Sequence, residues 1–251
     1  MKRLAVIPAR YASSRFPAKP LAELKGRSMI MWVYDAVVAS GLFDRVVVAT
    51  DDERIEGRVK ECGGDVVMTS VSCTCGTQRC EEVLTALEKA GEPYDLVVNV
   101  QGDEPLIKKE QLADVVSLFE SDDCRIATLA KKIEQAEDLF DPNCVKVVFA
   151  RNRAIYFSRS VIPYLRGVSA EDYLKQSCHY KHIGLYAYTS EALHEIVRLS
   201  VSTLEKAESL EQLRWLENGF RVFIKPTAFE SIGVDTPEDL ERINRMLEKD
   251  K

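Results

Sequence analysis

The chain opens on the stretch Leu4-Ala-Val-Ile-Pro-Ala-Arg-Tyr-Ala-Ser-Ser-Arg-Phe-Pro-Ala-Lys19. Its apolar start, Leu4 to Ile7, is typical of a short buried strand. The loop that follows carries three cations, Arg10, Arg15 and Lys19, before a helical pattern begins near Ser28. Like charges on one loop repel each other, whereas a bound polyanion would neutralise them. A nucleoside triphosphate over the end of this strand fits, because open α/β sheets bind ligands there.

The same alternation continues through the first 150 residues. Apolar, β-branched runs predict strands at 45–50, 65–68, 95–100 and 144–149, and helical periodicity predicts helices at 29–38, 53–62, 77–90 and 111–119. Strands that alternate with helices indicate βαβ units, and nearly continuous apolar strands indicate burial on both faces. We therefore expect an α/β protein with a mostly parallel twisted sheet flanked by helices.

After about residue 150 the pattern changes. Aromatic, strand-like runs at 154–157 and 183–188, separated by a polar stretch, predict a small, partly antiparallel subdomain over about 150–205 within a single domain, 1–251. Beyond it we expect one helix over 204–219, with Leu210, Leu213 and Leu216 on its core stripe and Gly219 as its cap. A strand at 220–224 and a helix at 237–249, introduced by Thr236 and Pro237, complete the chain.

Composition excludes several classes of protein. A net charge of −6 argues against general nucleic-acid binding, and no apolar run approaches the roughly 20 residues of a membrane span. Pro8 and Arg10 interrupt the first apolar run too early for a secretion signal. Seven cysteines, an odd number, then favour reduced thiols and a cytoplasmic location. Three of them, Cys73, Cys75 and Cys80, could bind a metal, but without C-x2-C pairs or a nearby histidine they suit loop packing better.

The second informative stretch is Asn99-Val-Gln-Gly-Asp-Glu-Pro105. It delivers Asp103 to the carboxyl end of a strand, opposite the cationic loop, where a carboxylate can hold Mg2+. Gly102 allows unusual dihedral angles or a close approach. Asp235, just before the predicted cap Thr236, could complete the magnesium site. The alternatives are that Asp103 caps a helix beginning near Lys108 and that Asp235 forms a local turn.

Several motifs, taken in chain order, resemble those of the 3-deoxy-manno-octulosonate (Kdo) cytidylyltransferases, the CMP-Kdo synthetases of Gram-negative bacteria. They span nearly the whole chain, and several lie in its second half. Besides the opening loop and 99–105, they are Thr50-Asp-Asp52, Met68-Thr-Ser70, Gly76-Thr-Gln-Arg79, Tyr156-Phe-Ser-Arg-Ser160, Lys181-His-Ile-Gly184, Leu210-Glu-Gln-Leu-Arg214 and Gly233-Val-Asp-Thr-Pro-Glu-Asp-Leu240.

The resemblance implies a Rossmann-like nucleotidyltransferase fold and a Mg2+-dependent reaction. CTP and Kdo would give CMP-Kdo and pyrophosphate, for the inner core of lipopolysaccharide, through in-line attack of the sugar's anomeric hydroxyl on the α-phosphorus. It also implies a homodimer that forms through the second-half subdomain. Other readings are a synthetase for sialic acid or 8-amino-Kdo, and a non-catalytic sensor that binds CTP.

The resemblance also implies roles for individual residues. The catalytic set would be Arg10, Lys19, Asp103 and Asp235, with both aspartates binding magnesium. CTP would contact Pro8, Ala9, Arg10, Ser14, Arg15, Lys19, Cys75, Gly76, Arg79 and Gln101. Kdo would contact Arg159, His182, Tyr186, Glu211 and Gln212.

The sugar-binding roles have plain structural alternatives. A planar guanidinium such as that of Arg159 suits the Kdo carboxylate, but Arg159 could instead bridge to a surface carboxylate. His182 could be a core histidine, and Glu211 could pair with Arg214 on a helix.

The chain departs from the family pattern at four positions. Cys73 stands in place of histidine, Cys75 in place of serine, Gln78 in place of an acid, and Ala18 in place of glycine. Loss of the serine hydroxyl at Cys75 removes a hydrogen-bonding group near the expected cytosine site. We expect altered affinity there rather than loss of activity.

Overall fold

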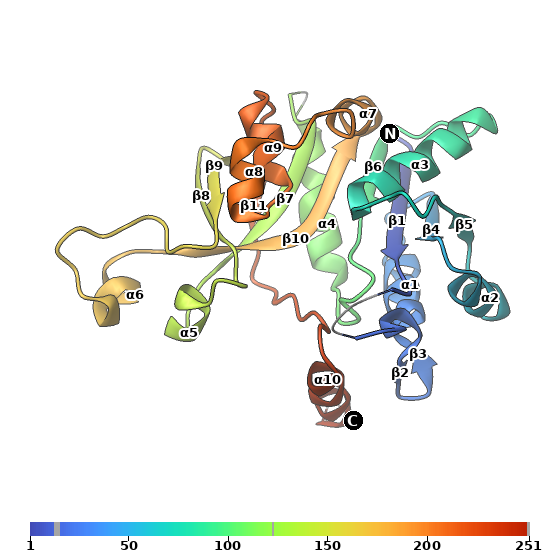
Figure 1. Ribbon diagram of the computed structural model, residues 1–251, viewed down its shortest axis with the longest axis horizontal. Coiled ribbons are helices and arrows are strands. Elements are labelled where there is room, and N and C mark those ends of the chain that lie inside the picture. Colours follow the sequence, from blue (N-terminus) through green and yellow to red (C-terminus); the bar gives the residue numbers. More distant parts are fainter. Residues whose placement is uncertain (13–15, 122, 250–251) are drawn as a thin grey trace. The chain divides into compact units, whose positions relative to one another are not determined.

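The computed structural model describes residues 1–12, 16–121 and 123–249. The chain divides into two compact units: Met1–Leu112 with Ser231–Lys251, and Ala113–Glu230 (Figure 1). The stretch 150–205, where we expect a sugar-binding and dimerisation subdomain, lies inside the second unit.

The first unit contains a parallel sheet in the order β5-β4-β1-β6. Its strands are β1 (Arg3–Ala9), β4 (Arg45–Thr50), β5 (Val66–Met68) and β6 (Leu96–Asn99), and β1 pairs in parallel with both β4 and β6. Burial on both faces explains the continuous apolar runs: Leu4, Val47 and Val97 are fully buried. The α/β prediction is confirmed.

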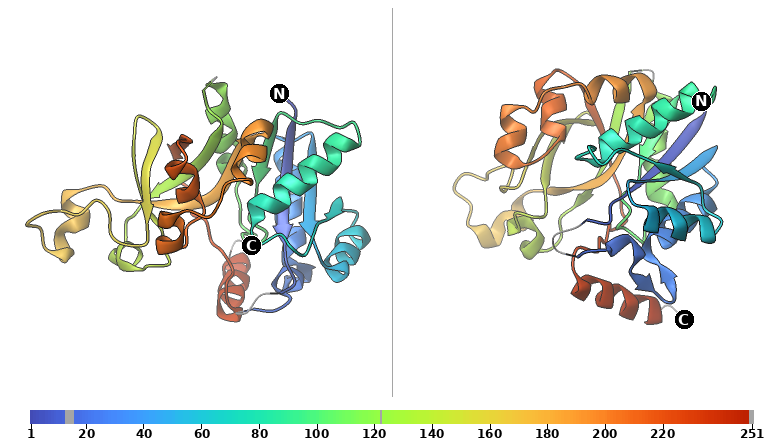
Figure 2. Two further views of the ribbon diagram at one scale, coloured as in Figure 1. Left: turned by 45° about the horizontal axis from the view of Figure 1, so that its top comes forward. Right: turned by 45° about the vertical axis from the view of Figure 1, so that its right-hand side comes forward.

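Helices connect these strands near the predicted positions: α1 (Met29–Ser40), α2 (Glu53–Glu61) and α3 (Gly76–Lys89). Helix α4 (Lys109–Ser117) contains the boundary between the units, and α10 (Pro237–Lys249) is the last helix of the first unit. Helix α3 packs on β1, β4 and β6, and both views of Figure 2 show it lying across these strands.

Three short elements of the first unit were not predicted. After the opening loop come η1 (Lys19–Leu21) and a hairpin of β2 (Glu23–Leu24) and β3 (Arg27–Ser28). Lys25 and Gly26, at the tip, have φ angles of 50° and 75°. Positive φ at both central residues matches the right-handed twist of a two-residue hairpin.

The second unit contains a mixed sheet in the order β10-β7-β11-β9-β8. Its strands are β7 (Ile126–Lys132), β8 (Lys146–Ala150), β9 (Arg153–Ser158), β10 (Tyr180–Thr189) and β11 (Val222–Pro226). Among the described strands of this unit, only the β7–β11 pair is parallel. The sequence analysis missed β7, because its alanines and lysines lack the β-branched signal of a strand.

The helices of the second unit are short. They are η2 (Leu118–Glu120), α5 (Ala136–Phe140), η3 (Ala170–Asp172), α6 (Tyr173–Gln176), α7 (Ser190–Ile196), α8 (Thr203–Glu208) and α9 (Gln212–Glu217).

The single helix predicted over 204–219 is wrong. Ser209 adopts a left-handed conformation, φ 52° and ψ 48°, and separates α8 from α9. A left-handed residue ends the run of helical hydrogen bonds. The buried side chains Leu210 and Leu213 kept the apolar spacing of a helix across this break. Gly219, with a φ of 82°, follows α9 as predicted.

Candidate functional site

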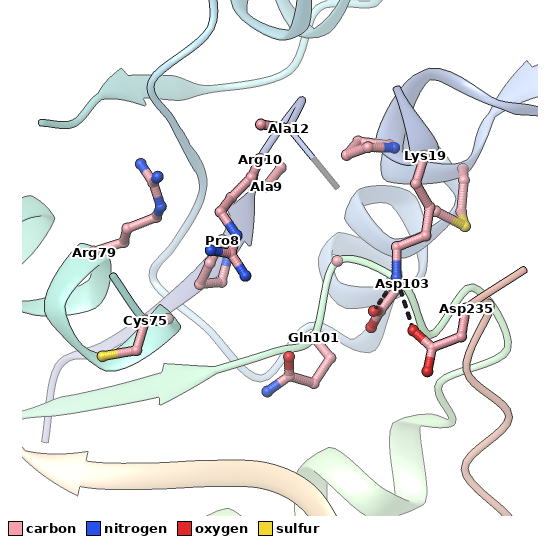
Figure 3. A pocket seen from close by; sticks show the side chains of 14 residues that line it. Pro8, Ala9, Arg10, Ala12, Lys19, Cys75, Arg79, Gln101, Asp103 and Asp235 are labelled. Atoms are coloured by element: carbon pink, nitrogen blue, oxygen red, sulfur yellow. Dashed lines mark hydrogen bonds and ion pairs between the residues drawn. The ribbon is translucent and has the colours of Figure 1, made fainter. Parts of the chain in front are cut away.

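A cavity of about 450 Å³ in the first unit gathers most of the predicted nucleotide-binding residues. Its wall comes from the end of β1, η1, the start of α3, the turn after β6 and the segment before α10. The predicted residues that line it are Pro8, Ala9, Arg10, Lys19, Cys75, Gly76, Arg79, Gln101, Asp103 and Asp235 (Figure 3). Ser14 and Arg15 lie outside the described residues.

Lys19 joins the two aspartates. Its Nζ lies 2.6 Å from Oδ2 of Asp103 and 3.3 Å from Oδ1 of Asp235. Figure 3 shows both carboxylates directed at this ammonium group, with Cys75 and Arg79 on the opposite side of the view. Two carboxylates far apart in the sequence therefore share one cation.

A tight turn after β6 positions Asp103. The Glu104 N–H donates to the Gln101 carbonyl over 3.3 Å, which leaves Gly102 and Asp103 at the centre of the turn. A Cβ on Gly102 would lie 2.7 Å from the Pro8 carbonyl oxygen, so this close approach requires glycine. Near the start of α4, Gln111 Oε1 accepts the hydrogen bond from the Lys108 N–H over 3.0 Å. The capping bond at the start of α4 thus comes from Gln111, and among the described residues Asp103 is not seen to make one.

The segment before α10 positions Asp235. The Val234 N–H donates to the Asp103 carbonyl over 2.9 Å, and the Ser231 hydroxyl donates to the Glu104 carboxylate. Burial raises the pKa of Glu104 to about 7, although the bond from Ser231 opposes that change. Helix α10 takes its cap from Thr236, whose hydroxyl oxygen accepts from the Asp239 N–H over 3.3 Å. The Asp235 carboxylate is therefore directed at Lys19 rather than used as the cap.

The start of α3 forms the other wall of the cavity. Cys75 occupies the N-cap position, and its side chain makes no cap hydrogen bond. Gln78 accepts from the Thr74 N–H over 2.7 Å and from the Thr74 hydroxyl over 3.0 Å. An amide oxygen therefore serves as an acceptor where the family usually has an acid.

The thiol of Cys73 belongs to the loop that precedes α3. It donates to Glu82 Oε2 over 3.1 Å, and the same carboxylate accepts from the Ser70 N–H over 2.8 Å. Burial, and then the bond to Glu82, raise the pKa of Cys73 to about 12. A protonated thiol is a poor metal ligand. Glu82 organises this loop, and the sequence analysis did not single it out.

Arg79 lines the cavity, yet its guanidinium already has partners. Nη1 donates to the Thr69 hydroxyl over 2.6 Å, and Nη2 pairs with Asp51 Oδ2 over 2.8 Å. Arg79 is only 1% exposed. It ties α3 to the residues that follow β4 and β5, which is a structural role beside its predicted contact with CTP.

The opening loop contains a strained residue. Ala18 has a φ of 58° and a ψ of 17°, the left-handed region that favours glycine. Its N–H donates to the Tyr11 carbonyl over 3.0 Å. The guanidinium of Arg54 lies 3.3 Å from the centre of the Tyr11 ring and bonds Asp52 through two nitrogens. The family's glycine at position 18 thus has a conformational reason, and Arg54 is a loop contact that sequence reasoning missed.

The predicted sugar-binding residues all lie in the second unit. His182 Nε2 lies 3.1 Å from the Thr128 hydroxyl, and its ring contacts Phe157 and Tyr186 with centroids 5.2 Å away. Burial lowers the pKa of His182 to about 3, so the imidazole is neutral near pH 7. These contacts agree with the alternative of a core histidine, and a neutral ring can still accept or donate one hydrogen bond.

Arg159 contacts main-chain oxygens rather than a surface carboxylate. Its guanidinium donates to the carbonyls of Glu208, Pro142 and Ser209 over 2.7, 3.0 and 3.4 Å. The Glu208 carboxylate accepts from the Ser158 hydroxyl over 2.6 Å and from the Arg159 N–H over 2.9 Å. Burial raises the pKa of Glu208, but these bonds outweigh burial and lower it overall. Sequence reasoning missed Glu208, which it placed inside one long helix.

The remaining sugar candidates lie beside an aromatic cluster. Tyr186 packs edge-on against Trp215, with ring centroids 5.2 Å apart. Burial first, and then the charge of Glu211, raise the pKa of Tyr186. Glu211 also lies 3.4 Å from Arg214, as the helix-pair alternative predicted, and Gln212 is buried.

Comparisons with known proteins agree on one family. Residues 4–232 match the family model described as cytidylyltransferase. The chain is 53% identical to the 3-deoxy-manno-octulosonate cytidylyltransferase of Phocaeicola vulgatus, covering 99% of this chain and 98% of that protein. It is 47% identical to the Thermodesulfovibrio yellowstonii protein of the same name, covering 98% of each.

A solved structure of CMP:2-keto-3-deoxy-manno-octonic acid synthetase complexed with CTP superposes with a TM-score of 0.91. It has 37% identity and covers 100% of both chains. A cytidylyltransferase from Leptospira borgpetersenii, 18% identical with a TM-score of 0.64, shares the fold; the match covers 99% of this chain and 87% of that one. Among the described residues no helix has the length and apolar character to cross a membrane.

Proposed function

This chain belongs to the cytidylyltransferase family, and on that premise we propose that it activates Kdo with CTP to form CMP-Kdo and pyrophosphate. The anomeric hydroxyl oxygen of Kdo forms a bond to the α-phosphorus. The bond from that phosphorus to the oxygen bridging to the β-phosphate breaks, pyrophosphate leaves, and the hydroxyl proton is lost. The observation that carries the proposal is the convergence of Lys19, Asp103 and Asp235 on one cavity.

The cavity residues divide by chemistry. Arg10 and Lys19 are cations that suit the triphosphate. Pro8, Ala9 and Gly76 offer main-chain groups to the cytidine, and Gln101 offers an amide. Holding charged reactants in line supplies most of what a phosphoryl-group transfer requires of the protein. Ser14 and Arg15 stay predictions for the same ligand.

The donor set fits a magnesium ion. Asp103 and Asp235 present carboxylate oxygens to a shared cation, and Mg2+ typically binds through one or two carboxylates together with substrate phosphates. When bound, it would neutralise phosphate charge and make the attacking hydroxyl more acidic. The protein contributes the fixed turn that holds Asp103 and the capped helix that follows Asp235.

The second unit supplies the residues proposed for Kdo. Arg159 has more N–H donors than its three carbonyl bonds use, so donors remain for a sugar carboxylate. Neutral His182, Tyr186, Glu211 and Gln212 provide hydrogen-bonding groups for the sugar hydroxyls.

We also propose a cytoplasmic homodimer that serves lipopolysaccharide inner-core synthesis. Tyr164 is 75% exposed and Phe140 is 47% exposed, and both contact the ring of Tyr173. Exposed apolar side chains gathered in this way mark interaction surfaces.

A pyrophosphate-release assay tests the reaction. CTP, UTP, ATP and GTP are each supplied with Mg2+, with and without Kdo. We expect pyrophosphate release only in the reaction that contains both CTP and Kdo. Release with sialic acid or 8-amino-Kdo, and none with Kdo, would replace the sugar assignment. CTP binding without any product would favour the sensor.

A further inference from the structure

Ser231 and Glu104 form a link to which the proposed reaction assigns no role. The Ser231 hydroxyl donates to the Glu104 carboxylate. Glu104 directly follows Asp103, and Ser231 is the first residue of the segment that returns to the first unit and leads to Asp235. The link therefore joins the two segments that carry the metal-binding carboxylates.

A second link fastens the other end of the returning segment. The Val234 N–H donates to the Asp103 carbonyl over 2.9 Å. Between the two links, Ile232 packs in the apolar cluster of Leu24, Met29 and Ile243. Asp235 follows immediately, so its main chain has little freedom relative to Asp103.

Glu104 is equally well held on its own side. Its N–H closes the turn around Asp103, and its carbonyl accepts from the Ile107 N–H over 3.2 Å. Among the described residues, Asp103 and Asp235 are joined by no third carboxylate, histidine or cysteine in a set that could hold a metal. Glu104 therefore acts on the pair through the chain rather than as a ligand.

We propose that Glu104 and Ser231 are positioning residues that set the separation of the Asp103 and Asp235 carboxylates for one divalent cation. The proposal rests on the proposed function, in which these aspartates bind magnesium. Groups that orient metal ligands without touching the metal typically change metal affinity about 10–100-fold when removed.

The test measures Mn2+ binding to the protein with CTP present and Kdo absent, as the loss of the free Mn2+ electron paramagnetic resonance signal beyond the loss that the same CTP causes without protein. We expect Ser231→Ala and Glu104→Ala each to raise the Kd for Mn2+ about tenfold or more. The double variant should bind Mn2+ no more weakly than either single variant, because both substitutions remove the same hydrogen bond. Glu104→Gln, whose amide oxygen can accept from Ser231, should keep most of the affinity.

Ser40→Ala is the matched control, since it removes a buried hydroxyl of the same unit that donates to the Val37 carbonyl over 2.6 Å. It should lower the unfolding temperature and leave the Kd for Mn2+ unchanged. An unchanged Kd in folded Ser231→Ala, or a wild type that binds no Mn2+ with CTP, would overturn the proposal. If the variants change the Kd for Mn2+ as expected but the wild type releases no pyrophosphate from CTP and Kdo, the proposed function is refuted and the positioning role is not.

Discussion

At the scale of single residues, the site depends on one lysine between two carboxylates. Lys19 is largely buried, with 14% of its side chain exposed, so its ion pairs are less screened than surface pairs. Such a charge balance allows two acidic groups to lie close together before a metal or a triphosphate arrives. Removing one of the three charges should therefore affect chemistry more than folding.

Asp103→Asn tests this directly. We expect turnover to fall by orders of magnitude with the fold intact, because an amide is a far weaker ligand for a hard cation than a carboxylate. Asp95→Asn is the control: Asp95 lies just before the start of β6, the strand that leads to Asp103, and its carboxylate accepts from the Lys2 N–H. Near-normal turnover of Asp103→Asn at saturating Mg2+ would contradict the metal-binding role.

Arg159→Ala tests the sugar side. Loss of its guanidinium should raise the KM for Kdo by about tenfold or more, as expected for a lost charge-assisted bond, with little change in CTP affinity. Arg153→Ala, which removes an exposed arginine at the other end of β9, serves as the control. A fall in CTP affinity instead would show that the assignment of Arg159 to the sugar rather than to CTP is wrong.

At the scale of elements, local chemistry at helix ends decides much of the site. Thr236 and Asp239 cap α10, and a capping box of Ser202 and Glu205 begins α8. Helix α3 differs, because a cysteine holds its N-cap position. A thiol accepts hydrogen bonds weakly, so the first main-chain N–H groups of α3 gain little from it.

Cys75→Ser should therefore stabilise the protein by about 1 kcal/mol, the usual effect of a good N-cap. It should also raise the affinity for CTP, because position 75 lies in the α3 wall of the cavity. Urea unfolding and CTP titration measure the two effects. Cys62→Ser is the control, since Cys62 lies at the C-terminal end of α2, where no such cap is needed. No gain in stability at position 75 would show that the α3 cap is satisfied otherwise.

At the scale of the whole molecule, two compact units divide the proposed work. The first holds the cavity and both metal-binding candidates, and the second holds the residues proposed for the sugar. Each unit has an apolar cluster of its own, and the chain passes from one unit to the other after residues 112 and 230. Stability and assembly are properties of these units rather than of any one site.

The neutral, partly buried His182 predicts how stability depends on pH. Its pKa is about 3 in the folded state and about 6.5 when unfolded. Between these values the unfolded chain binds the extra proton, so stability is fully present above pH 6.5 and declines as the pH falls toward 3. The contribution of His182 to this slope approaches about 1.4 kcal/mol per pH unit. Between pH 4 and 8 the free energy of unfolding should change less steeply with pH in His182→Gln than in the wild type. Equal slopes in the two proteins would refute a neutral imidazole.

Assembly gives a separate prediction. Tyr164→Glu should shift the protein from dimer to monomer in sedimentation velocity, because it places a charge on the exposed aromatic surface of the second unit. Ile155→Glu is the control: Ile155 is 62% exposed and lies on β9, outside that cluster. A wild type that sediments as a monomer would contradict the dimer, and a Tyr164→Glu variant that stays dimeric would contradict the assignment of the contact to this surface.

The amino-acid sequence alone determined the parallel sheet of the first unit, the cationic loop, and the candidacy of Asp103 and Asp235. Strand burial, loop charge and helix caps are local signals that can be recognised in the sequence itself. Only tertiary structure decided that Lys19 holds both aspartates, that Arg79 is tied to Asp51 and Thr69, and that Ser209 divides α8 from α9. Those features depend on which distant segments meet and on the free energy of their packing, and periodicity within a short window carries no record of either.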